Sequence, residues 1–201
     1  MRDGHNIRQV EQLGIDWMGF IFYPPSPRFV KERPSYMPSK RIKRIGVFVN
    51  ADWDFMVDHI DAYALDFVQL HGNESPSLCR ELKRQTGKGI IKAFGIRDCT
   101  DLEQTADYGD AADFFLFDNQ CETAGGSGKA FNHDILTQYQ GNKPFLLSGG
   151  LGPENISEIK SLNHHLLYGI DLNSRFETSP ALKSVNRLQH FIHEYTKAET
   201  L

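Results

Sequence analysis

The chain has 201 residues, of which 40% are hydrophobic and 24% charged, and its formal net charge is −4. This composition predicts one globular domain spanning residues 1–201, and it disfavours nucleic acid or an anionic membrane as a partner. No apolar run reaches the roughly 20 residues of a membrane helix, and no signal-peptide pattern opens the chain, so we expect a cytoplasmic protein.

Three cysteines, Cys79, Cys99 and Cys121, are odd in number and widely spaced. Cysteines in such an arrangement predict neither a disulfide framework nor a metal site.

Residues 1–16 place apolar side chains at helical spacing, with Asp3 or Asn6 able to cap the helix and Gly14 able to end it. After this helix, short apolar strands alternate with helical segments. The expected strands are Trp17–Phe22, Ile45–Val49, Phe67–Leu70, Gly89–Phe94, Phe114–Phe117, Pro144–Leu147 and Leu166–Ile170. The expected helices are Asp52–Tyr63, Ser75–Gln85, Asp101–Tyr108, Asn132–Tyr139, Pro153–Leu162 and Ala181–Tyr195.

These strands are apolar throughout rather than alternating, which is typical of a parallel sheet that helices cover on both faces. An open doubly wound sheet and a (β/α)₈ barrel both fit that pattern. No G-x-G-x-x-G follows the first strand, and polar, Gly-rich segments follow many strands, which favours the barrel. We therefore predict an α/β protein with a (β/α)₈ TIM barrel of seven strands and eight helices, each strand being followed by a helix. The first strand of the barrel would lie before residue 1, and its loss would leave two unpaired edges.

Asp118 ends an apolar strand and is followed by the Gly-rich segment Gly125–Lys129. A carboxylate in this position is either a cap or salt-bridge partner, or a catalytic acid. A long Gly-rich segment that can fold over a substrate favours catalysis.

The loops after the last two strands also have a chemical signature. In barrels of this kind these loops frequently bind phosphate through backbone N–H groups. Gly149 and Gly150 would let the backbone approach an anion closely, and Asn173 and Ser174 offer hydrogen-bond donors. One such loop would favour a simple turn, whereas two on adjacent final strands favour a phosphate site.

Two further side chains are candidates for substrate contacts. Arg28 follows three prolines, and its stiffly held guanidinium could bind a carboxylate through two hydrogen bonds. Without those neighbours it would be read as an exposed loop arginine. His71 follows a strand and could orient substrate or donate a hydrogen bond, although a partly buried structural histidine fits equally well.

Taken in order, the motifs resemble the phosphoribosylanthranilate isomerase family over essentially the whole chain. The motifs are Gly19–Phe22 leading to Ser26–Arg28, Gly46–Asn50, Val68–Gly72, Phe117–Asp118 with Gly125–Phe131, Leu147–Leu151 with Pro153–Asn155, and Gly169–Ser174 with Glu177.

The resemblance implies an Amadori rearrangement in tryptophan biosynthesis, which converts N-(5-phosphoribosyl)anthranilate to 1-(2-carboxyphenylamino)-1-deoxyribulose 5-phosphate without a cofactor or metal. It implies that Asp118 is the general acid and that Arg28 binds the anthranilate carboxylate. The phosphate site would comprise the Gly149–Gly150 and Asn173–Ser174 loops, with Asp171 at the end of the last strand. Monomers and homodimers both fit such a family.

One departure concerns the general base. The family begins with a strand of the type Lys-Ile/Val-Cys-Gly, whose cysteine is the base, and this sequence starts just after that motif. Cys79, Cys99 and Cys121 do not substitute by position, so we expect the 201-residue chain to have little activity. One alternative is a barrel that only binds a phosphorylated ligand. Another is indole-glycerol-phosphate synthase, which would need an N-terminal extension and a catalytic lysine.

Overall fold

The computed structural model describes residues 1–119 and 133–197. Its main sheet has seven strands, and each strand pairs in parallel with the next one along the chain. The strands are β1 (Trp17–Ile21), β2 (Lys43–Phe48), β3 (Phe67–Leu70), β4 (Gly89–Ile96), β5 (Phe114–Asn119), β6 (Phe145–Ser148) and β7 (Leu167–Ile170).

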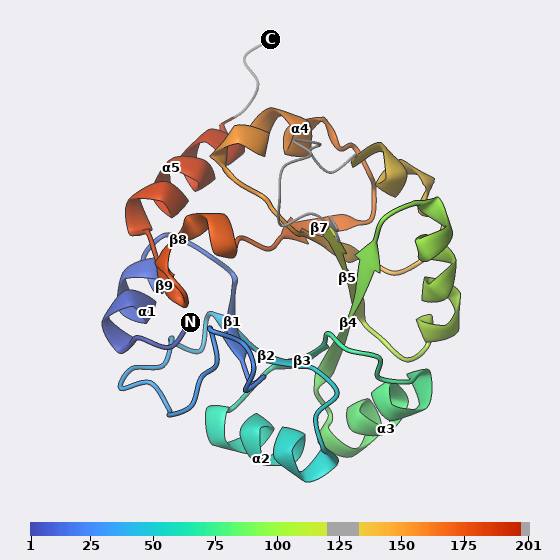
Figure 1. Cartoon of the computed structure of the whole chain (residues 1–201), viewed down its shortest axis with the longest axis horizontal. Helices are drawn as coiled ribbons and strands as arrows, with labels where there is room; N and C mark the ends of the chain where they lie inside the picture. The colour runs from blue at the N-terminus through green and yellow to red at the C-terminus, as the bar shows by residue number, and fades with distance from the viewer. Residues whose placement is uncertain (120–132, 198–201) are drawn as a thin grey trace.

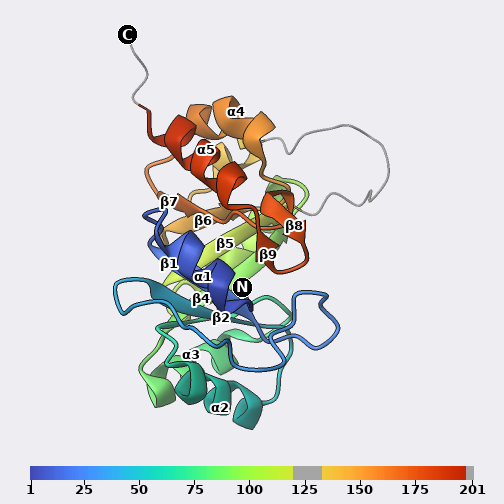
Figure 2. The same ribbon diagram turned by 90° about the vertical axis from the view of Figure 1, so that its left-hand side faces the viewer.

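The sheet curls so that, seen end-on, its strands form an arc with the helices outside it (Figure 1). The α-helices are α1 (Gly4–Glu11), α2 (Trp53–Tyr63), α3 (Pro76–Thr86), α4 (Ile156–Ser161) and α5 (Val185–Thr196). The described residues also form four 3₁₀ segments, η1 (Cys99–Tyr108), η2 (His133–Gln138), η3 (Pro153–Asn155) and η4 (Ser174–Phe176). In the side view, α2 and α3 lie on one side of the strands, and α4 and α5 lie on the other (Figure 2).

Local sequence explains where the helices begin and end. The Asp3 carboxylate accepts a hydrogen bond from the backbone N–H of Asn6 at 2.7 Å and so caps α1. Ser75 caps α3 in the same way, and Pro76 occupies its first turn, where no N–H partner is needed. Gly87 ends α3 with a φ of 66°, which a glycine adopts without steric cost.

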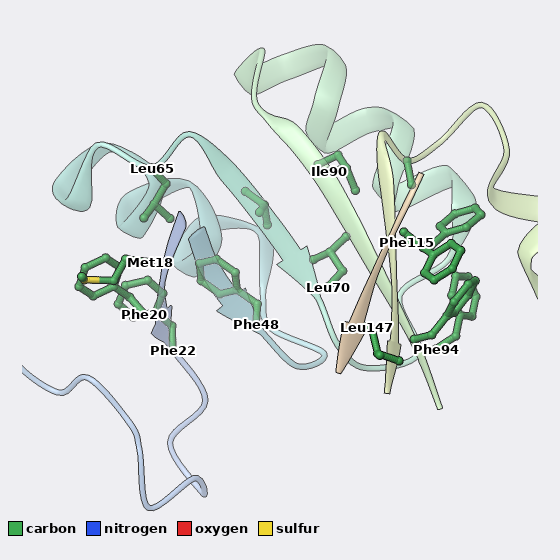
Figure 3. Close-up of a cluster of buried hydrophobic side chains, with 14 of the residues drawn as sticks. Met18, Phe20, Phe22, Phe48, Leu65, Leu70, Ile90, Phe94, Phe115 and Leu147 are labelled. Carbon is green, nitrogen blue, oxygen red and sulfur yellow. The ribbon is translucent and has the colours of Figure 1, made fainter. Parts of the chain in front are cut away.

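Buried side chains cover both faces of the sheet. The larger group packs between strands and helices and includes Phe20, Phe22, Phe48 and Phe115, each almost completely buried (Figure 3). A smaller group is separate from it and consists of Ile45, Ile91, Ala93, Leu116 and Leu146. Successive residues of a strand face opposite sides, so the two groups lie on opposite faces of the sheet. The continuously apolar strands of the sequence are explained by burial on both faces.

The edge strands of the sheet are β1 and β7. Among the described residues, no strand pairs with the outer edge of either one. The curl nevertheless brings the two strands close at one end, where the ring centroids of Trp17 on β1 and Tyr168 on β7 lie 5.7 Å apart. A short antiparallel hairpin, β8 (Glu177–Ser179) and β9 (Leu182–Lys183), lies beside α1 on this side of the molecule (Figures 1 and 2).

The prediction of an α/β protein with a parallel sheet of seven apolar strands is confirmed. The prediction of eight helices, one after each strand, is wrong. The described residues form five α-helices and four 3₁₀ segments, and residues 22–42, between β1 and β2, contain no helix. Prolines at positions 24, 25, 27, 34 and 38 explain this, because each removes a backbone N–H donor.

The start of the last helix was also predicted wrongly. It begins at Val185 rather than Ala181, because β8 and β9 occupy residues 177–183 and Ser184 is the cap. The Gly125–Lys129 segment and Cys121 lie outside the described residues. In the described part of the chain, no helix has the length and apolar character required to cross a membrane.

Replacing Gly46 by alanine should destabilise the fold. A methyl group there would meet Leu65 and would lie 2.9 Å from the Phe48 ring, and both side chains are almost fully buried. We expect a loss of about 1–3 kcal/mol in the free energy of unfolding, measured by urea denaturation.

Gly19→Ala on the adjacent strand is the matched control. Among the described residues, a methyl group at Gly19 meets only Val47, at 4.0 Å, so we expect a change within about 0.5 kcal/mol. Equal destabilisation by the two substitutions would contradict the packing argument.

Candidate active site

The described candidate residues gather at one rim of the sheet. In a parallel sheet all the carboxyl ends of the strands lie on the same side. Arg28 follows β1, His71 follows β3, Asp118 lies near the end of β5, and Asp171 follows β7. The Gly149–Gly150 and Asn173–Ser174 loops leave β6 and β7 at the same rim.

Asp118 is held by a chain of hydrogen bonds from β3. His71 Nε2 lies 3.3 Å from Asp118 Oδ2, and the amide Nε2 of Gln69 lies 2.9 Å from His71 Nδ1. An amide nitrogen only donates, so in this arrangement His71 Nδ1 is an acceptor and His71 Nε2–H is the donor to Asp118. His71 and Asp118 are each about one-third exposed, at 33% and 29%, so a ligand can reach this pair.

Asp171 lies next along the rim. Its Oδ2 accepts a hydrogen bond from Ser148 Oγ at 3.2 Å, and Ser148 is in register with Asp118 on the neighbouring strand. Burial raises the pKa of Asp171, against the opposing effects of Lys183 and of the Ser148 hydrogen bond. The charge of Asp118 adds to the rise, so the two carboxyl groups belong to one electrostatic cluster.

Arg28 and Glu177 form a bidentate ion pair beyond Asp171. Arg28 Nη2 lies 2.7 Å from Glu177 Oε2, and Arg28 Nε lies 2.9 Å from the same oxygen. The Glu177 side chain is only 6% exposed. Burial alone would raise the pKa of Glu177, but the Arg28 hydrogen bonds and the charges of Lys183 and Arg28 hold it below its usual value.

Lys183 contacts both Asn173 and Glu177. Its Nζ donates to the Asn173 backbone oxygen at 2.9 Å and to Asn173 Oδ1 at 2.7 Å, and lies 3.4 Å from Glu177 Oε1. Burial lowers the pKa of Lys183, while Glu177 and Asp171 act in the opposite direction. The rim therefore has one group of polar contacts at Gln69, His71 and Asp118 and another at Asn173, Lys183, Glu177 and Arg28. Charges from both groups act on Asp171.

The two glycine positions after β6 have backbone conformations that other residues rarely adopt. Gly149 has a φ of 90° and Gly150 a φ of 65°. Both lie in the left-handed region, so a side chain at either position would be strained. Arg175 and Glu154 form an exposed ion pair between this loop and the segment after β7.

A buried lysine supports the segment that carries His71. Lys92 Nζ donates to the backbone oxygens of Leu70 and Gly72, at 3.1 and 2.7 Å, and lies 3.4 Å from Glu74 Oε2. The Lys92 and Glu74 side chains are 3% and 1% exposed. Glu74 also accepts from the Gly72 N–H, so this ion pair holds the chain on both sides of His71.

Three residues of this rim, Gln69, Glu177 and Lys183, are not among the site residues that the sequence predicts. Gln69 and Lys183 are polar side chains in strands, and a buried polar residue within an apolar strand was the available signal for Gln69. Glu177 belongs to one of the family motifs, but its role at the rim is not apparent from the sequence. Its contact with Arg28 spans 149 positions of sequence, and no local pattern reveals it.

Among residues 1–119 and 133–197, no group of three His, Cys, Asp or Glu side chains is placed to hold a metal ion. Cys79 is buried within α3, and burial raises the pKa of its thiol to about 11. Cys99 opens η1 and is exposed.

A curled parallel sheet with its polar groups at the carboxyl ends of the strands defines the class of barrel-like α/β enzymes. The sequence profile of N-(5'phosphoribosyl)anthranilate (PRA) isomerase matches residues 1–194. The chain therefore belongs to the phosphoribosylanthranilate isomerase family, whose members are isomerases of tryptophan biosynthesis.

Individual relatives and solved structures support the same family. The chain is 48% identical over 199 residues to N-(5'-phosphoribosyl)anthranilate isomerase of Parabacteroides distasonis, covering 96% of this chain and 90% of that protein. It resembles the crystal structure of the Thermotoga maritima isomerase with a TM-score of 0.82 and 29% identity, over 97% and 95% of the two chains. A third relative is an isomerase crystallised with reduced 1-(o-carboxyphenylamino)-1-deoxyribulose 5-phosphate, at a TM-score of 0.79 and 25% identity, covering 97% and 98%.

Removing the buried cation at position 92 should destabilise the fold strongly. Lys92→Met leaves the Glu74 carboxylate buried without its ion-pair partner, at an expected cost of about 3–5 kcal/mol in the free energy of unfolding. Lys43→Met is the matched control, because the Lys43–Asp66 pair is largely exposed and should contribute about 0–1 kcal/mol. Urea denaturation of both variants measures the difference, and comparable losses would contradict this account of Lys92.

Proposed function

We propose that this isomerase converts N-(5-phosphoribosyl)anthranilate to 1-(2-carboxyphenylamino)-1-deoxyribulose 5-phosphate through the rim residues described above, within one domain spanning residues 1–201. The observation that carries this proposal is that polar contacts hold both Asp118 and Arg28 at one rim, with Asp171 under the charges of Asp118 and Lys183. The family's place in amino-acid biosynthesis supports a cytoplasmic location.

The substrate is an anion at both ends, and the proposed contacts match that charge pattern. Arg28 binds the anthranilate carboxylate, since its side chain is 24% exposed and its guanidinium is held by Glu177. The backbone N–H groups of the Gly149–Gly150 and Asn173–Ser174 loops bind the phosphate. The reduced product analogue bound by the related isomerase carries the same two anionic groups.

Asp118 acts as general acid in this proposal. It donates a proton to the ribose ring oxygen, the bond between that oxygen and C1 breaks, and the nitrogen lone pair forms an imine with C1. A base then removes the proton from C2, which gives the enolamine and, after tautomerisation, the ketose. In this proposal His71 orients the Asp118 carboxyl group through its Nε2–H and also contacts the substrate. Asp171 shares this cluster.

The family's base is a cysteine on a strand of the type Lys-x-Cys-Gly. We propose that such a strand lies between β1 and β7 and completes a (β/α)₈ barrel. In the described residues no strand pairs with the outer edge of β1 or of β7, which supports this arrangement. Without that strand the 201-residue chain would bind its ligand and turn it over poorly.

Extending the chain at its N-terminus with a Lys-x-Cys-Gly strand should therefore raise both stability and activity. We expect roughly 10²–10⁴-fold more isomerase activity, the usual contribution of a general base. Complementation of a tryptophan auxotroph that lacks the isomerase measures the effect in cells. The same extension with serine in place of cysteine is the control, and it should restore stability alone. Full complementation by the 201-residue chain would contradict the proposed need for this strand.

In the extended chain, Asp118→Asn should lower kcat by roughly 10²–10⁴-fold while the unfolding temperature changes little, because the amide keeps the shape but not the acid. Asp110→Asn is the matched control, since Asp110 is exposed before β5 and pairs only with Arg80 among the described residues. An Asp118→Asn enzyme with normal kcat would rule out the acid role.

A further inference from the structure

We infer that Glu177 and Lys183, carried by the β8–β9 hairpin, are positioning residues that set the two ends of the substrate site separately. Glu177 orients Arg28 for the carboxylate, and Lys183 orients Asn173 for the phosphate. This inference rests on the proposed function, because it takes the roles of Arg28 and Asn173 from there.

The contacts of Glu177 fit a residue that acts through Arg28. Its two oxygens accept from Nε and Nη2 along one edge of the guanidinium, which fixes the plane of that group. No hydrogen bond to Nη1 exists among the described residues, so this nitrogen remains for a ligand. Oε1 also accepts from the Ala181 N–H at 3.1 Å, which ties the carboxylate to the turn of its own hairpin.

The contacts of Lys183 are directed to a different partner. Its two hydrogen bonds to Asn173, at 2.9 and 2.7 Å, are clearly shorter than its 3.4 Å contact with Glu177. Both bonds go to oxygens of Asn173, one in the backbone and one in the side chain. The side-chain amide nitrogen and the following N–H groups are thereby oriented as donors, as a phosphate requires.

The hairpin itself is anchored to the start of the chain. The Asn6 side chain donates to the Lys183 backbone oxygen at 2.9 Å and accepts from its N–H at 2.7 Å. Arg2 donates to the backbone oxygens of Pro27 and Pro180, at 3.1 and 3.3 Å, and so joins the Arg28 loop to the hairpin turn. These contacts hold Glu177 and Lys183 in fixed positions relative to the two loops.

Glu177 contacts the cations at both ends of the proposed site, Arg28 and Lys183. A buried ion pair is a weak source of stability, because desolvation offsets much of its attraction, whereas it constrains geometry strongly.

The test measures binding of three probes to the full 201-residue chain by isothermal titration. The probes are reduced 1-(o-carboxyphenylamino)-1-deoxyribulose 5-phosphate, the analogue that lacks the carboxylate, and the analogue that lacks the phosphate. Glu177→Gln should weaken the two carboxylated probes about tenfold and leave the third within about twofold. Lys183→Met should weaken the two phosphorylated probes about tenfold and leave the third within about twofold.

Two matched controls carry the same substitutions on the surface. Glu81→Gln lies on α3, where Glu81 pairs with Arg84, and Lys43→Met lies on β2. Neither should change the affinity for any probe. Glu177→Asp provides a second variant if Glu177→Gln does not unfold cooperatively. It keeps the buried charge but is too short to hold Arg28, so the loss should again be confined to carboxylated probes.

If Glu177→Gln or Lys183→Met weakens the binding of all three probes equally, or weakens the binding of none, the inference is wrong. Arg28→Met separates it from the proposed function. The quantity compared is the affinity for the carboxylated probe relative to the analogue that lacks the carboxylate. If Arg28→Met abolishes this difference in affinity and both Glu177 variants keep it, the inference fails and the proposed function stands. If Arg28→Met keeps that difference, the proposed role of Arg28 fails, and the role of Glu177 fails with it.

Discussion

Parallel pairing of β1 to β7 is the constraint on which the rest of the structure depends. Each parallel strand must be reached by a crossover, so the chain returns outside the sheet between strands, mostly through helices. The same constraint points all the carboxyl ends to one rim. Side chains from β1 to β7 can therefore meet there although they are far apart in sequence, as Arg28 and Glu177 do.

Two ion pairs at this rim, Lys183–Glu177 and Lys92–Glu74, are almost completely buried. Glu177 and Lys183 are at most 9% exposed, and Lys92 and Glu74 at most 3%. Buried charges of this kind need partners, which fixes the loops that carry them. The Lys92–Glu74 pair holds the segment around His71, and the Glu177 group holds the Arg28 loop. Rigid support of this kind keeps the candidate site residues in place before a ligand arrives.

Conditions along the rim differ from one carboxyl group to the next. Burial raises the pKa of Asp171, while cations next to Glu177 lower its pKa despite burial. Glu177 is thus suited to a permanent charge that holds cations. Asp118 contacts a histidine rather than a permanent cation, which suits a group proposed to give up a proton.

Local sequence determined the class of fold and most of the rim. Apolar strands without alternation required burial on both faces and hence a parallel sheet, and strand ends identified Arg28, His71, Asp118 and the two final loops. Motif resemblance identified the family. The tertiary structure alone decided which of these side chains touch. Glu177 contacts Arg28 from 149 positions away and Lys183 contacts the Asn173 loop, and the hairpin that carries both has no periodic pattern of its own. Contacts between distant segments follow from how the sheet curls, and no short stretch of sequence encodes that curvature.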